Sequence, residues 1–85
     1  MSVKRTAILV LLLAATPAQA QTGCAGAIAQ FRGVIDNDVK IGHLSKSVHN
    51  RIMPDLGRVA ETCRAGKDAE AMRALAGLKS RFGYR

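Results

Sequence analysis

Apolar residues recur at helical spacing along two successive segments of the chain. The first series is Cys24, Ile28, Phe31, Ile35 and Val39. The second series is Val48, Ile52, Leu56, Val59 and Cys63. Intervals of three and four residues place each series on one face of an α-helix. Gly42 can end the first helix and the serines at 45 and 47 can cap the second, so we expect a turn at 42–47.

The two apolar series are mirror images, as the facing sides of an antiparallel hairpin must be. Pairing them in opposite directions gives five pairs whose residue numbers always add to 87, from Cys24 with Cys63 to Val39 with Val48. This register brings the cysteines together at the open end of the hairpin. Residues 1–20 have the pattern of a secretory signal, and two cysteines in a small exported chain are expected to oxidise, so we predict a structural Cys24–Cys63 disulfide.

The same register sets charged residues beside the apolar seam. It places Arg32 opposite Asp55 and Asp36 opposite Arg51. We therefore expect two salt bridges between the helices, each worth about 0–1 kcal/mol because such pairs are exposed.

A third helix is predicted after the hairpin. Gly66 can end the second helix and Asp68 can cap the third. The apolar positions of the third helix are Ala71, Met72, Leu75, Leu78 and Phe82. Gly83 should stop it, leaving Tyr84 and Arg85 as a tail. The expected fold is all-α: a disulfide-stapled antiparallel helical hairpin with a third short helix packed on it, with helices at about 24–40, 47–65 and 68–82.

The segment before the first helix has the parts of a secretory signal. Lys4 and Arg5 precede an apolar run at 7–15, and Pro17 is followed by Ala-Gln-Ala at 18–20, a typical cleavage pattern. The run is short for a membrane-spanning helix, which disfavours the alternative of an uncleaved anchor. We therefore expect residues 1–20 to be removed, leaving 21–85 as one small periplasmic or secreted domain that is not transmembrane.

Charge then narrows the choice of partner. The chain has 13 Lys and Arg against six Asp and Glu, and loss of Lys4 and Arg5 with the signal leaves a net charge of +5. Outside the cytoplasm, this positive net charge argues against nucleic acid as the partner. It favours binding to a periplasmic protein or to an anionic surface. The candidate contact residues are Arg73, Lys79, Arg81 and Arg85. There are two simpler explanations of the positive charge. It keeps the protein soluble, or the cations complement the dipole at the C-terminal end of a helix.

Acidic residues near the hairpin turn suggest a metal site. Asp36 and Asp38 supply carboxylates at alternate positions, as hard cations prefer, and the register brings His49 opposite Asp38. The calcium-loop pattern does not fit, because Lys40 and Ser47 occupy ligand positions. The alternative is that Asp and Asn simply mark the end of the first helix. We expect no other cofactor, and we take His43 and His49 as surface histidines rather than a transition-metal pair.

Several stretches resemble small two-cysteine periplasmic helical proteins of proteobacteria. They are the two cysteines, the turn at 42–47, the link Gly-Lys-Asp-Ala-Glu-Ala at 66–71 and the closing Ser-Arg-Phe-Gly-Tyr at 80–84. A periplasmic lanthanide-binding chaperone is similar in general character. That resemblance implies metal binding near Asp36 and Asp38, although its ligands do not map onto this chain residue by residue.

These observations favour a non-enzymatic function. Capping explains the serines beside the histidines better than nucleophilic catalysis does. We expect a small exported binding or adaptor protein. The alternatives are a metal-handling protein that binds a calcium- or lanthanide-like ion near Asp36 and Asp38, and a basic protein of the membrane surface.

Overall fold

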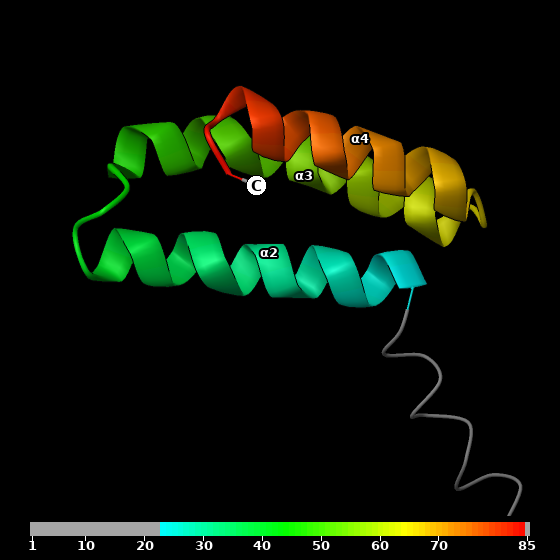
Figure 1. Cartoon of the computed structure of the whole chain (residues 1–85), viewed down its shortest axis with the longest axis horizontal. Helices are drawn as coiled ribbons and strands as arrows, with labels where there is room; N and C mark the ends of the chain where they lie inside the picture. The colour runs from blue at the N-terminus through cyan, green and yellow to red at the C-terminus, as the bar shows by residue number, and fades with distance from the viewer. Residues whose placement is uncertain (1–22, 85) are drawn as a thin grey trace, which may run out of the picture.

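Three helices make up the described part of the chain. The computed structural model describes residues 23–84, in which α2 spans Gly23–Lys40, α3 spans Lys46–Arg64 and α4 spans Asp68–Arg81. Each predicted boundary lies within one residue of the observed one. The signal predicted at 1–20 lies outside the described residues. α2 and α3 run antiparallel, and α4 lies along α3 (Figure 1).

The core confirms the expected packing of a third helix on a hairpin. Its buried residues are Cys24, Phe31, Ile35, Ile52, Leu56, Val59, Ala71, Leu75 and Leu78. Phe31 and Leu56, which a hairpin alone would leave half exposed, are buried because Leu75 and Leu78 of α4 join the same cluster. Met72 was expected in this face of α4 but is 40% exposed, so that assignment is wrong. No helix within residues 23–84 is long and apolar enough to cross a bilayer.

The predicted disulfide is present. Cys24 and Cys63 are bonded, with their Cα atoms 5.9 Å apart, and they join the start of α2 to the end of α3. Closing a loop of this length stabilises the fold by about 4 kcal/mol in the chain-entropy model. A disulfide of this kind indicates a non-reducing compartment.

The helix ends follow from local sequence. Ser45 caps α3, since its hydroxyl accepts a hydrogen bond from the Val48 N–H at 3.1 Å. Gly66, at φ 85°, lets the chain leave α3, and the Lys67 N–H then bonds to the Thr62 carbonyl at 3.3 Å. This is the glycine-terminated helix end that the sequence predicted.

Asp68 differs from its predicted role. It is the first residue of α4 rather than the cap, and Lys67 occupies the capping position without a side-chain hydrogen bond. The Asp68 carboxylate instead accepts a hydrogen bond from the Cys24 N–H at 3.0 Å. Because the first N–H groups of a helix lack internal partners, Asp68 caps α2 across the fold. The contact lies at the disulfide end of the bundle.

Candidate functional site

Asp55 does not pair with Arg32, and that prediction is wrong. Asp55 accepts one hydrogen bond from Arg58 on the next turn of α3 and another from Arg81 of α4 at 3.2 Å. The predicted register considered only the two helices of the hairpin. The third helix, α4, brings the Arg81 guanidinium to the Asp55 carboxylate, where it competes with Arg32. Arg32 is exposed on α2 and makes no salt bridge with a residue in the range 23–84.

Asp36 pairs with His49 and not with Arg51, so the second predicted salt bridge is also wrong. The His49 Nε2 lies 2.7 Å from the Asp36 Oδ1. The Arg51 guanidinium instead lies over the Phe82 ring, with its central carbon 5.6 Å from the ring centroid. His49, which the register sets opposite Asp38, reaches Asp36 instead, and Asp38 is bonded to Tyr84.

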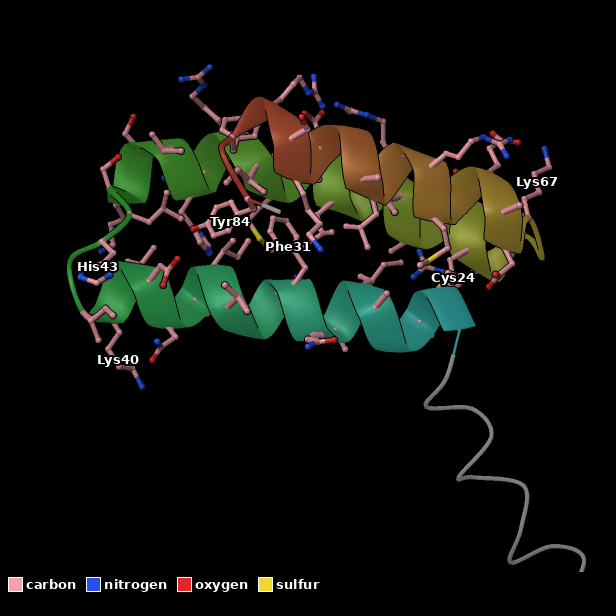
Figure 2. All side chains as sticks on the ribbon, viewed as in Figure 1. Cys24, Phe31, Lys40, His43, Lys67 and Tyr84 are labelled. Carbon is pink, nitrogen blue, oxygen red and sulfur yellow. A yellow bond between two sulfur atoms is a disulfide. The ribbon has the colours of Figure 1, made fainter. Side chains whose placement is uncertain are left out.

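Tyr84 is a packed residue rather than part of a free tail. Gly83, at φ 83°, turns the chain back, and the Tyr84 hydroxyl donates a hydrogen bond to the Asp38 carboxylate at 2.6 Å. The ring meets Phe31 edge to face, with centroids 5.3 Å apart (Figure 2). Burial, followed by the hydrogen bond and the negative charge of Asp38, raises the pKa of Tyr84 to about 12. We call Gly83 and Tyr84 the C-terminal latch.

The three predicted metal ligands are not assembled into one site. Asp36 and His49 are adjacent, but Asp38 is engaged by the latch residue Tyr84. Across residues 23–84, no group of three or more His, Cys, Asp or Glu is placed to hold a metal ion. His43 is exposed in the turn.

The four predicted basic contact residues have different environments. Arg81 is bonded to Asp55, and the Lys79 ammonium lies 5.9 Å from the centroid of the Phe31 ring. Arg73 is exposed on α4, whereas Arg85 lies outside the described residues. Two members of the group are therefore engaged within the fold.

A groove between α2 and α3 was missed by sequence reasoning. Its volume is about 480 Å³. Its walls come from α2 and α3, with no contribution from α4: Ala25, Ile28, Ala29, Arg32, Gly33, Asp36, Ala60, Cys63 and Arg64. The groove exists because α4 and the C-terminal latch pack on the other side of α2, where Lys79 and Tyr84 lie beside Ala27 and Val34.

Small side chains form the apolar floor of the groove. Ala25, Ala29 and Gly33 follow one another at four-residue intervals on α2, and Ala60 faces them from α3. A Cβ added at Gly33 would meet nothing within 4 Å, so the groove is open there. Ala25, Ala29 and Ala60 each directly follow a member of the apolar series in sequence. Alanine and glycine carry little apolar signal, which is why periodicity did not identify them.

The charged rim of the groove is predominantly basic. Arg32 and Arg64 both line it, and neither makes a salt bridge with a residue in the range 23–84. Asp36 is also on the rim, but its carboxylate is paired with His49. The groove therefore combines an apolar floor with two guanidinium groups available to an anionic partner.

Comparisons with known proteins identify no relative: no family model, curated protein or solved structure matches the chain.

Proposed function

We propose that this chain is a small exported binding or adaptor protein that acts without catalysing a reaction. In this proposal a partner protein docks in the groove between α2 and α3. The observation that carries the proposal is the apolar groove of about 480 Å³ on the side of the hairpin that α4 leaves uncovered.

The rest of the fold favours a stable surface of this kind. The disulfide joins both walls of the groove at one end, since Cys63 itself lines it. Ile28 and Cys63 line the groove and also pack against the buried core that the two helices share. A site whose walls are fixed before binding loses less conformational entropy when a partner docks.

The proposed compartment is the periplasm or the exterior of the cell. Support comes from the signal pattern at 1–20 and from the disulfide, which requires oxidising surroundings to persist. The proposed partner is accordingly an exported protein or the exported part of a membrane protein.

Site-specific photo-crosslinking in the producing cells tests the proposal. A photoreactive amino acid replaces Ala29 in the groove or, as a matched control, Ala76 on α4, since both alanines are exposed on helices. We expect a discrete crosslinked product at position 29 and none at position 76. Equal products at both positions, or no product at position 29, would contradict a partner in the groove.

A filled groove supplies a second test. Gly33→Leu places a branched side chain in the open part of the floor, and Gly77→Leu makes the same change on exposed α4. Both replace a helical glycine with a better helix former, so neither should destabilise the fold. The crosslink at position 29 should disappear with Gly33→Leu and persist with Gly77→Leu.

A further inference from the structure

We infer that the groove between α2 and α3 takes an amphipathic α-helix whose apolar face is bordered by two acidic residues about two turns apart. This inference rests on the proposed function and names the chemistry of its partner. The size, the floor and the rim of the groove each limit the occupant.

The size of the groove suits a short helix. Along α2 it extends from Ala25 to Asp36, which is about 16 Å at 1.5 Å per residue. A partner helix of about three turns spans that length. The floor consists of alanine and glycine, so the backbone of a partner helix can approach closely. The distance between packed helices depends on the side chains at their contact.

The rim determines the charge of the occupant. In the hairpin register Arg64 lies level with Gly23, so Arg32 and Arg64 are separated by nine residues, or about 13 Å, along the groove. Carboxylates seven residues apart on one helix are about 10.5 Å apart along its axis, and arginine side chains can cover the difference. Charge therefore favours an acidic helix over a second copy of this basic chain.

Designed peptides test the inference directly on the full chain with its disulfide intact. The probe is a 14-residue helical peptide with Ala and Leu on one face and Glu at two positions seven residues apart beside that face. One control peptide has Gln at both positions, and another has the two Glu residues on the opposite face. Binding is measured by fluorescence anisotropy, and the contact is mapped by amide chemical shifts.

We expect the first peptide to bind at least fivefold more tightly than either control and to shift the amides of Ala29, Gly33 and Ala60. Arg32→Gln/Arg64→Gln should reduce its affinity about five- to tenfold and flatten its salt dependence, because rim charges act through exposed ion pairs. Arg73→Gln, a matched change on exposed α4, should have no effect.

Other outcomes would overturn the inference. Equal affinity for all three peptides would remove the acidic requirement. Concentration-dependent dimers that Gly33→Leu abolishes would identify a second copy as the occupant. Binding to vesicles of anionic lipid that is lost in Arg32→Gln/Arg64→Gln would identify a membrane instead. A groove-specific crosslink in cells that survives the double arginine substitution would retain the proposed function while refuting the acidic helix.

Discussion

Tyr84→Phe removes one hydroxyl and leaves the ring that packs against Phe31. The lost interaction is the 2.6 Å hydrogen bond from Tyr84 to the Asp38 carboxylate. Hydrogen bonds to charged groups are worth about 1.5–3 kcal/mol when buried. Asp38 is half-buried and regains water in the variant, so we expect a loss of about 1 kcal/mol, which is below that range and typical of an ordinary hydrogen bond. For a domain this small, that corresponds to a fall in Tm of about 4–8 °C.

The pH dependence gives an independent measurement of the same contact. The pKa of Tyr84 is raised from 10.0 to about 12, first by burial and then by Asp38. A raised pKa means that the stabilising contribution is fully present below pH 10 and is lost as the pH rises toward 12. The stability difference between the wild type and Tyr84→Phe should therefore shrink across that interval.

Tyr84 can be followed without interference, because the chain contains one tyrosine and no tryptophan. Tyrosinate absorbance after a rapid pH jump should give a native pKa of about 12, and Asp38→Asn should lower it part of the way toward 10. Thermal unfolding followed by circular dichroism gives the change in Tm. A native tyrosine that titrates near 10, together with an unchanged Tm in Tyr84→Phe, would refute the C-terminal latch.

Two further predictions concern the disulfide end of the bundle. Cys24→Ala/Cys63→Ala should lose about 4 kcal/mol, comparable to the whole stability of a domain of this size, so its helical circular dichroism should be largely lost at room temperature; a fully folded variant would contradict this. Asp68→Ala should lower the free energy of unfolding in urea by about 1 kcal/mol, as loss of a helix cap does, whereas Glu70→Ala on the same turn of α4 should have a smaller effect.

The hairpin could be predicted because short sequence intervals determine each helix face and several of these intervals agree with one another. Intervals of three and four residues define each face, and the mirrored order of the two faces fixes their register. Ile35 and Ile52 occupy one rung of that register, and both are fully buried. The cysteines could be paired because their positions continue the same series to the open end.

The polar contacts could not be predicted from the register of two helices. Asp55 was assigned to Arg32, but Arg81 reaches it from α4, whose rotation about the hairpin is set by packing. Long polar side chains also reach beyond the position directly opposite them, as His49 does when it bonds to Asp36. Backbone register therefore places Cβ atoms and leaves the choice of polar partner open.

Tyr84 illustrates a second limit of sequence reasoning. The glycine before it was correctly interpreted as the end of a helix, but a glycine with positive φ also sets the direction in which the chain continues. Here that direction returns the tyrosine to α2, where Phe31 and Asp38 receive it. The contact joins α2 to the C-terminal end of the described chain, two segments that are far apart in sequence, so no local pattern could predict it.

The C-terminal latch and the groove are two consequences of one asymmetry. A hairpin has two sides, and the 14 residues of α4 can cover one of them. The latch extends that cover on the same side, so the other side of α2 retains a floor of alanine and glycine with Arg32 beside it. A fourth helix would be the usual way to close such a face. Within residues 23–84 no fourth helix does so, and the disulfide and the cap from Asp68 stabilise the open end of the hairpin instead. The uncovered face is the one on which we propose that the helix of a partner docks.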